Sequence, residues 1–129
     1  MTLAEAKPDI AGKNILIVED ELLLALDLQS IVEDLGAVVL GPASSIETAM
    51  ALLGKDAPDA ALLDANLRGS RVTPVAEALK ERNIPFVMVT GYGRLAMAEA
   101  ILEEAPRVRK PFSPEDIRAA LADLLDTSP

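Results

Sequence analysis

The sequence contains no cysteine, no histidine and no tryptophan. Without cysteine, the chain can form neither a disulfide nor a thiolate metal site. Without histidine, it lacks the base of a Ser-His-Asp triad and the usual ligands of a zinc site. Any chemistry that the protein performs must therefore come from carboxylates, hydroxyls, lysine and arginine.

Aromatic residues are almost as scarce, since Phe86, Tyr92 and Phe112 are the only three. Half of the 129 residues are nonetheless hydrophobic. We therefore expect a core of Leu, Val, Ile and Ala, in a chain long enough to form one without cross-links. The expected organisation is a flexible lead-in over residues 1–12, one domain over 13–126 and a tail over 127–129.

Positive charge is in the minority, with 12 basic against 21 acidic residues and a formal net charge of −9. Nucleic-acid binding needs clustered Lys and Arg, so this balance argues against it. It suits protein partners or a site that attracts a divalent cation. No apolar run reaches membrane-spanning length and no signal peptide is recognisable. We expect a cytoplasmic protein that binds neither nucleic acid nor membranes.

Short apolar runs alternate with helical patterns along the chain. The runs suit buried strands of a parallel sheet and cover about residues 14–18, 37–41, 60–64, 86–90 and 107–109. Helical patterns follow each run, and a polar loop is expected over residues 66–71, between the third run and its helix. A capping box at Ser44–Glu47 is expected to open the second helix, and Ser113–Asp116 is expected to cap the last. The alternation predicts a doubly wound α/β fold with helices on both faces of the sheet.

Functional groups stand at the carboxyl ends of four of these five runs. Glu19 and Asp20 end the first, Asp64 the third, Thr90 the fourth and Lys110 the fifth. Parallel strands bring these ends to one edge of the sheet. Clustered carboxylates repel one another unless a cation joins them, and oxygen ligands favour Mg²⁺. A hydroxyl and an ammonium beside them suit a transferring phosphoryl group.

Four segments together resemble the receiver domain of two-component response regulators. They are Ile-Leu-Ile-Val-Glu19-Asp20-Glu, Leu-Leu-Asp64-Ala-Asn66-Leu, Val-Thr90-Gly and Lys110-Pro111-Phe. The resemblance extends from about residue 14 to residue 125. It implies a flavodoxin-like (βα)5 fold with strand order 2-1-3-4-5.

The resemblance also implies the role of each residue at this edge. Asp64 would accept a phosphoryl group from a phosphohistidine on a sensor histidine kinase or a histidine phosphotransferase. Glu19, Asp20, Asp64 and the backbone carbonyl of Asn66 would bind Mg²⁺ or Mn²⁺. Thr90 would hydrogen-bond the phosphoryl group and Lys110 would pair with it, through a backbone whose Lys110–Pro111 bond is cis, as in relatives.

Two positions depart from the commonest receiver pattern. Glu19 stands where Asp is most frequent, which preserves the charge. Arg107 stands where many receivers have an aromatic switch residue. The Thr90-Gly-Tyr92 turn resembles a receiver subgroup, many of whose members are free-standing. We therefore hypothesise that Thr90 and Tyr92 form the switch, with the loop around Tyr92 reordering as phosphate recruits Thr90.

Two surfaces are candidates for partners. The expected core stripe of the first helix consists of Leu24, Leu28, Ile31 and Leu35. Leu22, Leu23 and Leu26 lie off this stripe, and exposed leucines beside a site often mark a partner surface. The alternative is a helix more deeply buried than usual. In receivers this helix docks the kinase, so we hypothesise that Leu23 and Leu26 contact it. The fourth helix, fifth strand and fifth helix form the usual dimer or target face in relatives.

The sequence thus predicts a stand-alone receiver that signals by protein contact or acts as a phosphate sink or shuttle, without enzymatic activity beyond Asp64 itself. Its downstream target is unknown. One alternative is a phosphate-independent interaction module. Another is a Mg²⁺-dependent phosphohydrolase of the haloacid dehalogenase type. In that family the nucleophile ends the first strand and a second acid follows two residues on, whereas Asp64 ends the third and Asn66 holds that position.

Overall fold

A five-stranded parallel sheet forms the centre of the molecule. The computed structural model describes residues 10–67, 70–91 and 100–126. Across the sheet the strands lie in the order β2 (Val38–Ala43), β1 (Asn14–Val18), β3 (Ala60–Asp64), β6 (Phe86–Thr90) and β7 (Arg107–Arg109). All neighbours pair in parallel. Numbered as the five predicted strands, this is the expected order 2-1-3-4-5.

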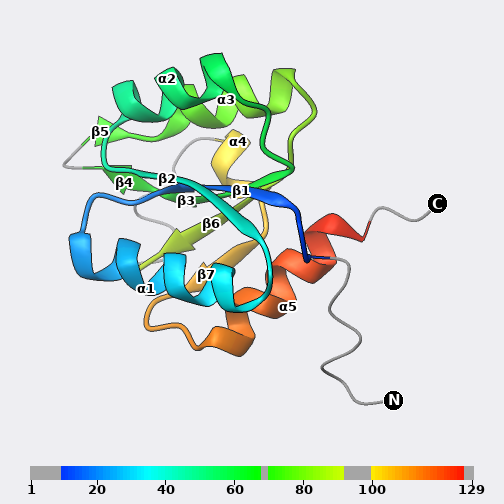
Figure 1. Cartoon of the computed structure of the whole chain (residues 1–129). Helices are drawn as coiled ribbons and strands as arrows, with labels where there is room; N and C mark the ends of the chain where they lie inside the picture. Colours follow the sequence, from blue (N-terminus) through cyan, green and yellow to red (C-terminus); the bar gives the residue numbers. More distant parts are fainter. Residues whose placement is uncertain (1–9, 68–69, 92–99, 127–129) are drawn as a thin grey trace.

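Helices cover both faces of the sheet, as expected of a doubly wound fold (Figure 1). On one face lie α1 (Leu22–Asp34) and α5 (Pro114–Leu125). On the other lie α2 (Ile46–Lys55), α3 (Thr73–Glu81) and the described part of α4 (Ala100–Glu103). The right-handed crossover between parallel strands places successive helices in this way.

The core consists of two aliphatic clusters, one on each side of the sheet. Along β1, Leu16 and Val18 pack toward α2 and α3, whereas Ile15 and Ile17 pack toward α1 and α5. The same alternation follows from the period of two in β3 and β6. Every residue of β3 is buried. Both faces of these strands are therefore apolar, which is why they read as continuous hydrophobic runs.

The packed part of the chain begins earlier than the predicted boundary at residue 13. Ile10 is 1% exposed and belongs to the cluster that also contains Leu28. The backbone N–H of Gly12 donates to the carbonyl of Gly36, at 2.8 Å. Burial of Ile10 stabilises this turn against the end of α1. At the other end, α5 finishes at Leu125.

The second strand continues beyond its predicted end at Gly41. It passes through Gly41 and Pro42, joined by a cis bond, to Ala43, with a register shift opposite β1. Gly41 has a φ of +95°, and a Cβ there would lie 2.6 Å from the backbone nitrogen of Ala43. Only glycine fits this position without strain. At the end of the strand, the carbonyl of Ala43 accepts a hydrogen bond from the backbone N–H of Glu19, at 2.9 Å.

The capping box predicted at Ser44–Glu47 is wrong by one residue. Ser45 is the N-cap of α2, and its Oγ accepts a hydrogen bond from the backbone N–H of Thr48 at 3.1 Å. Because β2 extends to Ala43, the helix begins later than the sequence indicated. The cap predicted at Ser113–Asp116 is confirmed, and the structure shows that it is a capping box, with both reciprocal hydrogen bonds present.

Two further local predictions differ from the structure. In α1 the buried residues are Ala25, Leu28, Ile31 and Val32, whereas Leu24, assigned to the core stripe, is only partly buried. The segment after Asp64, expected to be a polar loop, contains a short antiparallel pair of β4 (Asn66–Leu67) and β5 (Ser70–Arg71). The turn at Tyr92 and the first part of the predicted fourth helix lie outside the described residues.

Within the described residues, no helix is both long enough and apolar enough to span a bilayer.

Candidate functional site

One pocket opens at the carboxyl edge of the sheet, where a ligand site is expected in a fold of this kind. It measures about 670 Å³. The residues that line it come from the ends of β1, β3, β6 and β7 and from the start of α1: Glu19, Asp20, Glu21, Leu24, Asp64, Ala65, Thr90, Gly91, Lys110 and Pro111. The structure thus brings together five residues that the sequence placed at the ends of four different strands, namely Glu19, Asp20, Asp64, Thr90 and Lys110.

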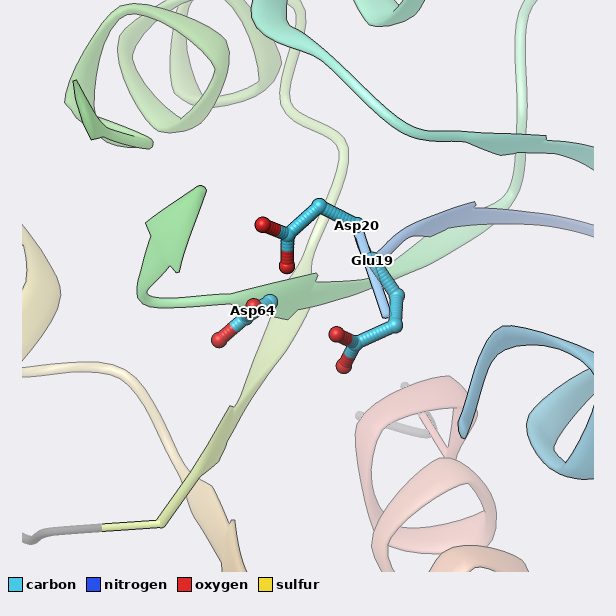
Figure 2. Close-up of side chains that lie close together, drawn as sticks. All are labelled: Glu19, Asp20 and Asp64. Carbon is cyan, nitrogen blue, oxygen red and sulfur yellow. The ribbon is translucent and has the colours of Figure 1, made fainter. Parts of the chain in front are cut away.

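Three carboxylates form the centre of this pocket. Glu19 and Asp20 leave the end of β1, Asp64 ends β3, and their side chains gather around one space (Figure 2). One oxygen from each lies within 4.8 Å of the others. Glu19 and Asp64 are buried, at 2% and 8% exposed. Carboxylates this close repel one another unless a cation offsets their charge, and an oxygen-only set suits Mg²⁺ or Mn²⁺.

Glu19 shows most directly that a cation fits here. Its Oε2 accepts a hydrogen bond from the backbone N–H of Glu21, at 3.1 Å. Its Oε1 is fully buried and makes no hydrogen bond to any described residue. Lys110 Nζ lies 3.3 Å from that oxygen, close enough for an ion pair but without hydrogen-bond geometry. A buried carboxylate oxygen without a directed donor is costly, so the donor set accommodates a bound cation.

Lys110 spans two of the carboxylates. Its Nζ is 3.3 Å from Glu19 Oε1 and 3.8 Å from Asp64 Oδ1, and its side chain is 21% exposed. Its backbone N–H donates to the carbonyl of Thr90 at 2.8 Å, which ties the lysine to the end of β6. The bond between Lys110 and Pro111 is cis, as the resemblance implied.

Of the remaining predicted residues that the structure describes, only Thr90 lines this pocket. Thr90 is 1% exposed and ends β6 in the pocket wall. Asn66 opens β4, directly after Ala65 of the pocket wall. Leu23 and Leu26 lie on the exposed side of α1. Tyr92 lies outside the described residues.

Five pocket residues were not predicted as part of the site: Glu21, Leu24, Ala65, Gly91 and Pro111. Glu21 donates its backbone N–H to Glu19, and its position in the acidic cluster was the available signal. Leu24 lines the pocket because it lies in the first turn of α1, which begins beside the carboxyl edge of the sheet. Gly91 lies against the stem of Lys110, since a Cβ there would be 3.7 Å from Lys110 Cδ. That proximity depends on the tertiary fold, and sequence carries no signal for it.

Comparisons with known proteins agree with this geometry. Residues 15–122 match the response regulator receiver domain family. The chain is 32% identical over 124 residues to the phyllosphere-induced regulator PhyR of Methylorubrum extorquens, a match that covers 94% of this chain and 46% of that protein. It is 26% identical over 112 residues to the transcriptional regulatory protein PdtaR of Mycobacterium tuberculosis, covering 84% of this chain and 55% of that protein. The chain thus spans about half the length of these curated relatives.

One solved structure is similar to this chain over almost its entire length. The solution structure of SdrG from Sphingomonas melonis Fr1 is 40% identical, with a TM-score of 0.78, and the match covers 90% of this chain and 98% of that one. The family match over residues 15–122 covers nearly the whole doubly wound domain. The acidic pocket is lined by the residues of the receiver motifs, at the carboxyl edge of the sheet. This protein belongs to the response regulator receiver domain family.

Proposed function

We propose that the protein is a phosphorylation-dependent switch in which Asp64 accepts a phosphoryl group from a phosphohistidine on a sensor kinase or a phosphotransferase. The observation that carries the proposal is the cluster of Glu19, Asp20 and Asp64 with Lys110 in ion-pair contact at the carboxyl edge of the sheet. Each group has a defined part in stabilising the charge that phosphoryl transfer develops.

The reaction forms one bond and breaks one. An oxygen of Asp64 attacks phosphorus while the P–N bond of the phosphohistidine breaks, and its electron pair returns to the imidazole nitrogen. Glu19, Asp20, Asp64 and the backbone carbonyl of Asn66 would hold a divalent cation, which offsets the charge of the phosphoryl oxygens when bound. Lys110 would pair with one of those oxygens, and the Thr90 hydroxyl would donate a hydrogen bond to another.

A change in the segment after Thr90 would convert phosphorylation into a signal. Recruitment of the Thr90 hydroxyl by the phosphoryl group would reorder the loop that carries Tyr92. The relative SdrG has been solved in a BeF3-activated conformation; this chain is 41% identical to it, with a TM-score of 0.75, over 89% of this chain and 98% of that one. That relative supports a switch driven by phosphate or its mimic.

Tyrosine fluorescence offers a direct test, because Tyr92 is the only tyrosine and tryptophan is absent. We expect BeF3 with Mg²⁺ to change the emission of the wild-type protein in a saturable manner. Asp64→Asn, which replaces the carboxylate that binds BeF3 with an uncharged amide, should show no saturable change. Equal responses in both proteins, or none in either, would contradict a switch at Tyr92.

The exposed leucines of α1 are proposed as the kinase-docking surface. Leu23 is 75% and Leu26 is 49% exposed. Leu26 also lines a groove of about 360 Å³ with Pro42 and Ser44, directly beside Glu19 and Asp20. An apolar surface at the rim of the phosphoacceptor site suits a helix that must bring a phosphohistidine to Asp64.

Serine substitutions separate docking from chemistry. We expect Leu23→Ser and Leu26→Ser to slow phosphotransfer from a sensor kinase by about tenfold, since loss of an interface anchor costs roughly 1–2 kcal/mol. Phosphorylation by acetyl phosphate, which needs no docking, should be unchanged. Met50→Ser on α2, also at an exposed position, is the matched control. Unchanged kinase rates in both leucine variants would rule out this surface.

We further propose that the phosphorylated protein acts by contact with a protein target or as a phosphate sink or shuttle. A homologue from Bartonella quintana is described as the anti-anti-sigma factor PhyR, so a protein-contact output exists among its relatives. The α4-β7-α5 surface is the candidate for this contact or for a dimer. On that surface Arg118 forms an ion pair with Glu115 of its own helix.

A further inference from the structure

Lys110 forms ion pairs with two carboxylates, and the two distances differ. Its Nζ is closer to Glu19, at 3.3 Å, than to Asp64, at 3.8 Å. Glu19 is also the more buried of the two carboxylates, with 1% of its side chain exposed against 10% for Asp64. An ion pair strengthens as water is excluded from it. The first acid of the cluster is therefore the main electrostatic partner of the lysine in this structure.

The length of the glutamate side chain makes this contact possible. An aspartate at position 19 would place its carboxylate one carbon–carbon bond, about 1.5 Å, nearer its own backbone. From 3.3 Å, a retreat of that size would take the oxygen beyond the limit of about 4 Å expected of an ion pair. Because Oε1 makes no hydrogen bond to any described residue, Lys110 is the cation that offsets its burial.

We propose that Glu19 is a positioning residue that holds Lys110 in the cation-free protein, so that the lysine and a divalent cation compete for the same carboxylate. The inference rests on the cation site of the proposed function and adds a regulatory step to it. The three carboxylates and the ammonium leave two net negative charges, which one divalent cation would neutralise. Cation binding then weakens the hold of Glu19 on Lys110 and frees its Nζ for the phosphoryl group on Asp64.

Competition of this kind is reciprocal, so it is measurable as cation affinity. Mn²⁺ binding can be followed by the loss of the free-ion signal in electron paramagnetic resonance, without any phosphorylation. Lys110→Met removes the charge and keeps the length of the side chain. We expect it to tighten Mn²⁺ binding about three- to tenfold, in the lower part of the range of couplings between groups in contact.

A double-mutant cycle assigns that effect to Glu19. In a Glu19→Asp background, Lys110→Met should tighten Mn²⁺ binding less than in the wild type, because the shorter acid no longer reaches the lysine and only the longer contact with Asp64 remains. Lys110→Arg, which keeps the charge, should bind Mn²⁺ like the wild type. Measurable Mn²⁺ binding by each variant also shows that its site is folded.

The outcomes separate this inference from the proposed function. Equal effects of Lys110→Met in the wild-type and Glu19→Asp backgrounds would overturn the role of Glu19 while leaving the cation site intact. A weaker or unchanged Mn²⁺ affinity for Lys110→Met in the wild-type background would also overturn the role of Glu19 and leave the cation site intact. No Mn²⁺ binding by the wild-type protein at all would overturn both proposals.

Discussion

Asp20→Asn is expected to lower the Mg²⁺ affinity of the protein by about a hundredfold or more. Asp20 contributes one of the three carboxylates whose oxygens lie within 4.8 Å of one another. Loss of a residue that merely supports a metal ligand costs roughly ten- to a hundredfold in affinity, and loss of a charged ligand should cost at least as much. Isothermal titration calorimetry measures the change directly.

The same substitution should stabilise the cation-free protein. Removing one of three clustered negative charges relieves repulsion between carboxylates, so the unfolding temperature without Mg²⁺ should rise. Asp27→Asn on the exposed side of α1 changes the net charge equally and is the matched control. Its Mg²⁺ affinity should equal that of the wild type. Unchanged Mg²⁺ affinity in Asp20→Asn would exclude Asp20 from the cation site.

Leu62→Ala is expected to lower the free energy of unfolding by about 2–5 kcal/mol. Leu62 is fully buried on β3, where it pairs with Ile17 of β1 and Val87 of β6. Truncation removes apolar contacts from the cluster that joins the sheet to α1 and α5 and leaves a cavity that these strands cannot close. Since small domains are stable by roughly 5–15 kcal/mol, this is a large fraction of the total.

Urea denaturation of the cation-free protein checks this expectation. Leu23→Ala is the matched control, because it makes the same chemical change at a side chain that is 75% exposed. Its free energy of unfolding should lie within about 0.5 kcal/mol of the wild type. A loss below about 1 kcal/mol for Leu62→Ala, or equal losses in the two variants, would show that β3 is not central to the core.

The strands were predictable from sequence because burial on both faces makes them continuous apolar runs. Ala60–Asp64 has five buried residues and was recognised for that reason. The site followed from topology, since parallel strands that end in Glu19, Asp64 and Thr90 must present these residues at one edge. The resemblance to receivers then assigned a role to each of them.

The features that sequence did not predict depend on contacts across the fold. The exact cap of α2 depends on how far β2 extends, and that extension depends on the fit of Gly41 beside Ile17 and Ala43. The position of Leu24 in the pocket wall rather than in the core depends on how the start of α1 packs against the sheet and α5. The preference of Lys110 for Glu19 over Asp64 is a difference of about half an ångström, far below what spacing along a chain can indicate.

The measurement that tests the central claim most directly is the intact mass of the protein after incubation with acetyl phosphate and Mg²⁺. The account predicts one added phosphoryl group on the wild-type protein, none after EDTA treatment, and none on Asp64→Asn. A wild-type protein that binds Mg²⁺ yet gains no mass with any small phosphodonor would contradict it and favour a phosphate-independent interaction module. An adduct that persists in Asp64→Asn would place the phosphoacceptor elsewhere.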